Sequence, residues 1–197
     1  VTLNQNATFT ANGGGTIAFN KNVVGNSSKF TVNSANGNVI FGDAATDQIT
    51  DVTTLESTGL TTINAGTITA QLTQDYNSAV TVNEDSTLTA GTNITFDSTI
   101  DADAAGGASL TLNAAGTTTF SDTVGATNAL ANLTTDAPGS TALNGGAVTT
   151  TAVQTYSDSV TLGADTTLEG TDLTLADTVD GAQALTLNGS GTTTFGG

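Results

Sequence analysis

The sequence predicts an all-β protein folded as a parallel β-solenoid, and three observations lead to this prediction. Apolar and polar residues alternate with a period of two in short segments, and no segment keeps a period of 3.6 residues. Turn signals rich in Gly, Asn and Asp separate these segments at short intervals. Similar strings also recur at long spacings along the chain, as in repeat proteins.

The expected strands are three to five residues long, with apolar side chains on one face and Thr on the other. Examples are Val-Thr-Val at residues 80–82 and Leu-Thr-Leu at residues 173–175. Turns are expected at the Gly-rich strings at residues 12–15 and 106–107 and around Pro138, the only proline. We expect essentially no helix.

A long repeat is the strongest signal in the sequence. The string around Tyr76 matches the string around Tyr156, which lies 80 residues later. Residues 85–88 match residues 165–168 at the same offset, and residues 110–120 match residues 185–195 at an offset of 75. A repeat of about 75–80 residues corresponds to four coils of ~20 residues, which bury a continuous core only when they stack.

A more divergent copy of the repeat occupies the N-terminal part of the chain. We therefore divide the chain into a divergent first copy (1–67), a second copy (68–147) and a partial third copy (148–197). These copies are expected to form one continuous solenoid segment, cut from a longer chain. In this scheme three phenylalanines occupy equivalent core positions: Phe41, Phe120 and Phe195.

The alternative architecture is a string of tandem β-sandwich modules of about 80 residues each. A sandwich needs longer strands and a larger aromatic core than this chain offers, since aromatic residues make up only 5% of it. The pattern therefore favours the solenoid.

The charge of the chain is extreme and excludes several classes of function. There are 18 acidic residues and only two basic ones, Lys21 and Lys29, for a net charge of −16. The chain has no basic patch to bind nucleic acid and no long apolar run to enter a membrane. Because His and Cys are absent, a Ser-His-Asp triad, a Cys nucleophile and a zinc site are excluded as well.

Asp residues in Gly-rich turns raise the question of calcium, which binds six to eight oxygen ligands. The candidate metal ligands are Asp97, Asp101, Asp103, Asp177 and Asp180. Neither a DxDxDG loop nor a GGxGxD nonapeptide is present, so solvated turn residues are the interpretation we favour. We expect no other cofactor.

Two further side-chain types have both a functional and a structural interpretation. Thr strings such as residues 117–119 and 192–194 would give rows of hydroxyls on a flat face, which can order water. The simpler interpretation is that β-branched Thr suits exposed strand positions. Tyr76 and Tyr156 could stack on sugars, or simply cover the edge of a coil.

Three strings resemble the repeats of filamentous-haemagglutinin-type proteins. They are Thr-Tyr-x-x-x-Val-x-Leu at residues 155–162, Leu-Thr-Leu-Asn at residues 185–188 and Gly-Thr-Thr-Thr-Phe at residues 191–195. Such proteins are very large bacterial exoproteins and adhesins, exported by two-partner secretion and folded as right-handed parallel β-helices. The resemblance implies a right-handed solenoid that is secreted, extracellular or on the bacterial cell surface.

The function we expect is structural: a rigid, acidic stalk or fibre that serves adhesion, cell aggregation or a biofilm matrix. Its partners would be neighbouring repeats or copies of itself, and cell-surface glycans or proteins. One alternative is a calcium-dependent surface adhesin module. The other is a polysaccharide-active β-helix enzyme, which we disfavour because a site for acidic sugars needs a cation and none follows Lys29.

Overall fold

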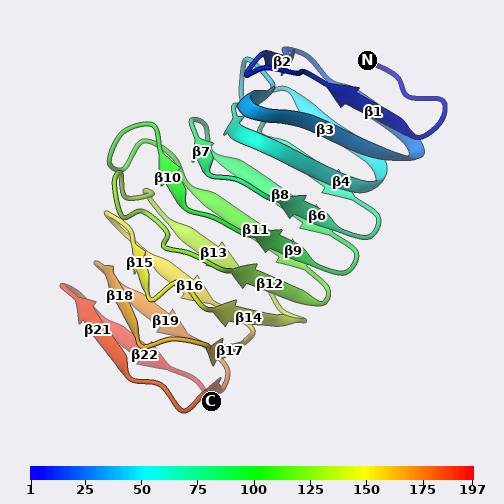
Figure 1. Ribbon diagram of the computed structural model, residues 1–197. Coiled ribbons are helices and arrows are strands. Elements are labelled where there is room, and N and C mark those ends of the chain that lie inside the picture. Colours follow the sequence, from blue (N-terminus) through cyan, green and yellow to red (C-terminus); the bar gives the residue numbers. More distant parts are fainter.

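The structure, a computed structural model that describes residues 1–197, is a β-solenoid of about nine turns. Its strands stack in order from the N-terminal end to the C-terminal end (Figure 1). Every strand pairing is parallel, and the chain contains no helix, so no apolar helix of membrane-spanning length is present. The predicted solenoid is therefore confirmed, whereas tandem sandwich modules would require antiparallel pairs.

The coils contribute strands to three successive faces, which we number in chain order. In one coil face 3 has only the single residue Val124, which bridges Ile100 and Val148. Face 1 consists of β5 (Thr67–Ala70), β8 (Ser86–Ala90), β11 (Leu110–Ala114), β13 (Leu133–Thr135), β16 (Gln154–Tyr156), β19 (Leu173–Leu175) and β22 (Thr193–Phe195). Face 2 consists of β1 (Ala7–Thr10), β6 (Gln74–Tyr76), β9 (Ile94–Phe96), β12 (Thr117–Phe120), β14 (Ser140–Leu143), β17 (Ser159–Leu162) and β20 (Val179–Asp180). Face 3 consists of β2 (Thr16–Phe19), β7 (Val80–Val82), β10 (Ile100–Ala102), β15 (Ala147–Thr149), β18 (Thr166–Gly170) and β21 (Leu185–Gly189).

Two strands are much longer than expected, because they continue around the corners of the solenoid. They are β3 (Val23–Phe41) and β4 (Gln48–Ile63), and each contributes to all three faces. The backbone turns these corners at residues with positive φ, including Asn26 and Asp51, and the pairing register shifts beside them. Asn and Asp tolerate this left-handed conformation better than most residues.

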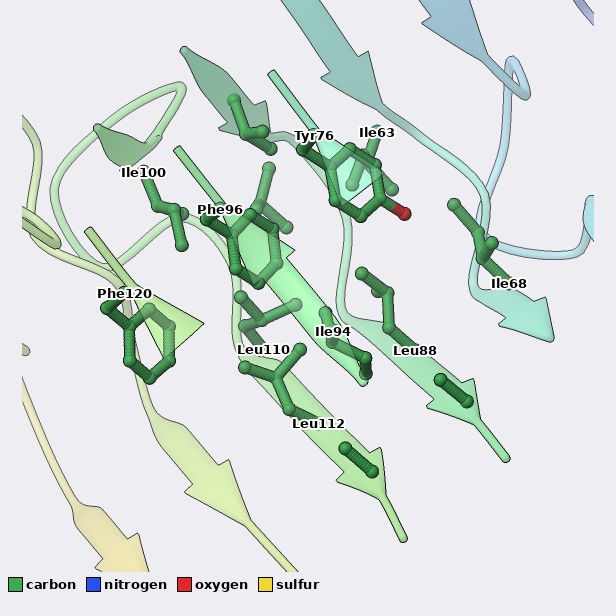
Figure 2. Packing of buried hydrophobic residues seen from close by; sticks show 14 of the residues in the cluster. Ile63, Ile68, Tyr76, Leu88, Ile94, Phe96, Ile100, Leu110, Leu112 and Phe120 are labelled. Carbon is green, nitrogen blue, oxygen red and sulfur yellow. The ribbon is translucent and has the colours of Figure 1, made fainter. Parts of the chain in front are cut away.

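The core is one continuous column of apolar side chains along the solenoid axis. It contains 39 buried residues, contributed by the inward side of all three faces. In Figure 2 the rings of Tyr76, Phe96 and Phe120 lie on successive strands of face 2. Their centroids are 5.0 and 5.8 Å apart and their planes nearly parallel, at 9° and 5°. Parallel pairing in register places like side chains on top of one another, so each coil covers the apolar face of the previous one.

The sequence repeat is present in the structure, but it does not correspond to four coils. Partner residues in successive coils are 18 to 26 positions apart, which agrees with the expected ~20 residues. Tyr76 lies on face 2 and Tyr156 on face 1, three full coils and two further faces later. One repeat thus spans eleven strand positions, and because eleven is not a multiple of three, each repeat is rotated by one face relative to the last.

This rotation corrects the expected equivalence of three phenylalanines. Phe41 lies on face 3 and pairs with Ile63, whereas Phe120 lies on face 2. Phe195 lies on face 1, and its ring is 58% exposed on the last coil. The three residues are equivalent in the sequence repeat, but they do not form one stacked column.

The division of the chain at residues 67/68 and 147/148 does not coincide with any break in the structure. The first boundary lies inside β5, the second lies inside β15, and both strands pair with neighbours in the same stack. The repeats therefore share one core.

Candidate functional site

The surface of the solenoid has no pocket that could enclose a small ligand. Any functional site must therefore lie on the three faces, on the corners between them or at the exposed ends of the stack. Three kinds of side chain are candidates for such a site: the acidic residues, the buried polar side chains and the outward Thr residues.

Three candidate metal ligands lie in the coil that contains β9 and β10. Asp97 is exposed just after β9, Asp101 lies within β10, and Asp103 follows that strand. The Asp101 carboxylate accepts hydrogen bonds from the backbone N–H groups of Thr127 and Asn128, at 2.8 and 3.0 Å. Asp101 therefore connects its own coil to the following one.

The other two candidate ligands lie four coils further along. Asp177 precedes β20 and its carboxylate accepts the backbone N–H of Thr178 at 2.7 Å, while Asp180 ends the strand and is exposed. At about 4.8 Å per coil, these residues are ~19 Å along the axis from the first group. The structure thus does not bring the five candidates together, and nowhere gathers three acidic side chains as a metal site.

Four acidic side chains instead accept backbone N–H groups of the next coil: Asp85, Asp101, Asp165 and Asp172. Asp85 accepts the N–H of Ser109 at 2.7 Å, and its repeat equivalent Asp165 accepts the N–H of Ala184 at 2.9 Å. These bonds satisfy corner N–H groups that the strand ladders leave free. Acceptors for corner N–H groups therefore explain part of the abundance of Asp.

A buried Gln–Tyr pair occurs once in each of the two better-matched repeats. The Tyr76 hydroxyl donates to Gln74 Oε1 at 2.8 Å, and Gln74 Nε2 donates to the carbonyls of Ile68 and Thr89 at 3.0 and 2.8 Å. Both side chains are fully buried, and burial raises the pKa of the Tyr76 hydroxyl. The expectation that Tyr76 stacks on sugars or covers a coil edge is therefore wrong.

Tyr156 forms the same arrangement on face 1. Its hydroxyl donates to Gln154 Oε1 at 3.0 Å, and Gln154 Nε2 donates to the carbonyls of Val148 and Glu169 at 3.1 and 2.7 Å. In both copies the Gln amide crosses a corner and joins two consecutive coils. The Gln-x-Tyr spacing in the sequence is the signal for this pair, because it places both side chains on the inward side of one strand.

Sequence reasoning missed two buried carboxylates, Asp47, which lies near Lys21, and Asp158. Asp158 is only 3% exposed, although it follows the core residue Tyr156 by two positions. Its carboxylate accepts hydrogen bonds from the hydroxyls of Thr135 and Thr141, both at 2.9 Å. Burial raises the pKa of Asp158, the two hydroxyls lower it in part, and the negative charge of Asp136 raises it further.

The second repeat has an uncharged version of the same cluster. The hydroxyls of Ser57 and Thr61 are 2.8 Å apart, and Ser78, 80 residues before Asp158, accepts the backbone N–H of Gly59 at 3.2 Å. Because Ser78 fills this place without a charge, the carboxylate of Asp158 is not required by the fold.

Both cations are paired with acidic side chains in neighbouring coils. Lys21 Nζ lies 2.6 Å from Asp43 and 4.0 Å from Asp47, and the hydrogen bond that Lys21 donates to Asp43 raises the pKa of Lys21. Lys29 Nζ lies 2.8 Å from Glu56. No free cation is therefore available on the surface for an anionic ligand.

The outward side of face 1 carries an unbroken row of Thr residues, one in each of seven consecutive coils. We call this surface the threonine face; its central row is Thr67, Thr87, Thr111, Thr134, Thr155, Thr174 and Thr194. The seven strands of face 1 contain no charged residue. The Thr strings that drew attention in the sequence contribute only one member of this row, Thr194.

Comparison of the chain with protein-family models, with curated proteins and with solved structures gives no match.

Proposed function

We propose that this chain is a rigid, acidic structural segment of a secreted or cell-surface protein, acting as a stalk or fibre in adhesion, cell aggregation or a biofilm matrix. The observation that carries the proposal is the single uninterrupted core, in which every coil is both support and cover for its neighbours. An architecture of this kind transmits force along its axis and can be extended by adding coils. The resemblance to filamentous-haemagglutinin-type repeats supports the same role and suggests two-partner secretion.

The surface supports a mechanical role more than a catalytic one. No pocket is available to hold a substrate, and both lysines are engaged in ion pairs. The acidic side chains that face the corners are occupied by backbone N–H groups. We therefore propose that the protein is not an enzyme, and that its partners are neighbouring repeats, copies of itself, and cell-surface glycans or proteins.

Force spectroscopy on the chain, held at its two ends, tests the mechanical role. A stalk built of equivalent coils should lengthen in repeated steps, each releasing ~20 residues, or about 70 Å of extended chain. Weakening the column with Phe96→Ala should make the central coils yield first, while Phe195→Ala, in the exposed last coil, should leave the pattern unchanged. A single collapse at a force too low to record would contradict the proposal.

The calcium-dependent adhesin module is the second candidate function, and it differs from the stalk because it predicts a heat stability that depends on calcium. If calcium were bound by the Asp residues, its removal would lower the melting temperature through the loss of binding free energy. We expect equal melting temperatures in millimolar calcium and in chelator, because the candidate carboxylates are separated and three of them are bonded to backbone N–H groups. A melting temperature clearly higher in calcium than in chelator would favour the adhesin module over the stalk.

A further inference from the structure

The threonine face is the longest part of the surface without charge, on a chain that carries a net charge of −16. In the corresponding outward row of face 2, Glu56 and Asp75 occupy adjacent coils, and Asp180 ends the row. On face 3 the outward positions include Asp101 and Glu169. Two copies of the chain that approach each other therefore meet the least like-charge repulsion when their threonine faces meet.

The hydroxyls of the threonine face are free to bond a partner. Thr89, beside the central row, accepts a weak hydrogen bond from Asn113 at 3.4 Å, but the seven central hydroxyls make no hydrogen bond within the chain. A hydroxyl is at once donor and acceptor, so a row of hydroxyls is complementary to a copy of itself. A partner of different chemistry would have to match the axial spacing of the coils, about 4.8 Å, over seven coils. A second copy of the chain has that spacing, because its coils are identical.

We propose that the threonine face is a lateral self-association surface, on which a second copy of this chain packs with its own threonine face. Thr134 is the middle member of the row, with three Thr residues on each side. A two-fold axis at Thr134 places the two solenoids antiparallel and brings Thr67 of each copy opposite Thr194 of the other. Such a contact is isologous and closes as a dimer.

The size of this surface sets the strength of the contact. Strands of three to five residues, at ~3.3 Å per residue, give a width of about 10–16 Å, and seven coils give a length of ~29 Å. Each copy thus buries roughly 300–450 Å², and the pair less than the ~1,200 Å² of a stable complex. Contact through these seven coils is therefore weak and reversible, and it strengthens with the number of coils that pair.

Salt should strengthen the association, because the rim of the threonine face is acidic. Asp85 and Asp172 lie along one edge of the face, and Asp136 and Asp177 along the other. Two faces in contact bring these rims together, and their repulsion is screened within ~3 Å at 1 M salt but extends to about 10 Å at 0.1 M.

Sedimentation of the 197-residue chain at concentrations up to about 1 mM tests the proposal, with matched charge variants. Thr134→Asp/Thr155→Asp places two carboxylates at the centre of the threonine face, on adjacent coils. The control Thr119→Asp/Ala142→Asp places the same pair on adjacent coils of face 2, where the next positions of the row, Thr95 and Thr161, are also uncharged. Both variants add the same charge and the same repulsion between coils. Any loss of stability caused by these charges should therefore be equal in the two variants.

We expect reversible dimers that increase with salt, an apparent dissociation constant raised at least ~tenfold by the face 1 variant, and a change below about twofold in the control. Amide protection in β13 and β16 that rises with protein concentration would report the same contact without any substitution. A monomer at every salt concentration, or equal weakening by both variants, overturns the proposal. A monomeric chain that shapes growing ice crystals would also overturn the proposal, because the threonine face would then order water and not bind a second copy. The stalk role survives each of these results, since force spectroscopy tests it separately.

Discussion

Tyr76 and Tyr156 occupy the same place in the sequence repeat but lie on different faces of the solenoid, and each donates a hydrogen bond to a buried Gln two residues earlier. Each Gln amide then donates to carbonyls of two consecutive coils. The buried Gln–Tyr pair therefore occurs in both copies, but on a face that is rotated by one position from the second copy of the repeat to the third.

Replacement of Gln154 tests how much the buried Gln–Tyr pair stabilises the fold. Gln154→Leu leaves the buried Tyr156 hydroxyl without its acceptor, and we expect a loss of about 1–3 kcal/mol in the free energy of unfolding, measured in urea. The double variant Gln154→Leu/Tyr156→Phe removes both partners and should recover part of that loss. Gln183→Leu, at an exposed site with a marginal 3.5 Å bond, is the control and should change stability by less than ~0.5 kcal/mol. Equal losses of unfolding free energy in Gln154→Leu and Gln183→Leu would argue against a stabilising role of the Gln–Tyr pair.

The aromatic column of face 2 gives a second prediction about stability. Phe96 is fully buried between the rings of Tyr76 and Phe120, so Phe96→Ala leaves a cavity that neighbouring coils cannot fill. We expect a loss of about 3–5 kcal/mol in the free energy of unfolding, within the usual range for Phe in a core. Phe195→Ala, at a side chain 58% exposed, should cost less than about 1 kcal/mol. Similar costs at the two positions would contradict the stacked core.

The period-two alternation and the repeat were enough to predict the all-β class, the parallel stack and the coil length. They were not enough to predict the rotation, because the similarity of Phe41, Phe120 and Phe195 says nothing of which face each occupies. A signal for it exists in the second copy, where Tyr76, Val82, Leu88 and Ile94 recur every six residues. Strands six residues apart give coils of 18 residues, of which 80 residues would make about 4.4, so the spacing indicates a rotation but not its size. The repeat has eleven strand positions, because longer corners extend some coils to as many as 26 residues.

The candidate sites were harder to predict, for a different physical reason. An Asp in a turn string can bind an ion, accept a backbone N–H or be buried, and the choice depends on the next coil, about 20 residues away. Asp85 accepts the N–H of Ser109, and Asp158 is covered by the hydroxyls of Thr135 and Thr141. Neither contact lies within the local sequence, so composition alone directed attention to the wrong carboxylates.

Stability near neutral pH should respond to Asp158. Its pKa is raised in the folded protein by burial, so the folded state binds a proton more tightly than the unfolded chain. The free energy of unfolding should therefore fall as pH rises from the unfolded pKa near ~3.9 through the raised folded pKa, and the penalty is complete only above the folded pKa. In Asp158→Ser, which installs the residue found at the equivalent position 78, this contribution to the pH dependence should disappear.

We expect Asp158→Ser to raise the free energy of unfolding at pH 7 by about 1 kcal/mol, and to lose that advantage as the pH is lowered below the pKa of Asp158. The reverse change, Ser78→Asp, should destabilise the second repeat at pH 7 and be partly rescued by acid, because a carboxylate would then occupy a partly buried position, where the Ser78 hydroxyl accepts the N–H of Gly59. Asp97→Asn removes one charge from an exposed position and controls for the reduction in net charge. Denaturant titrations from pH 4 to pH 8 measure all three variants. If Asp158→Ser lowers stability at pH 7, the two hydrogen bonds from Thr135 and Thr141 outweigh the cost of burying the charge, and Asp158 is a stabilising residue of the corner.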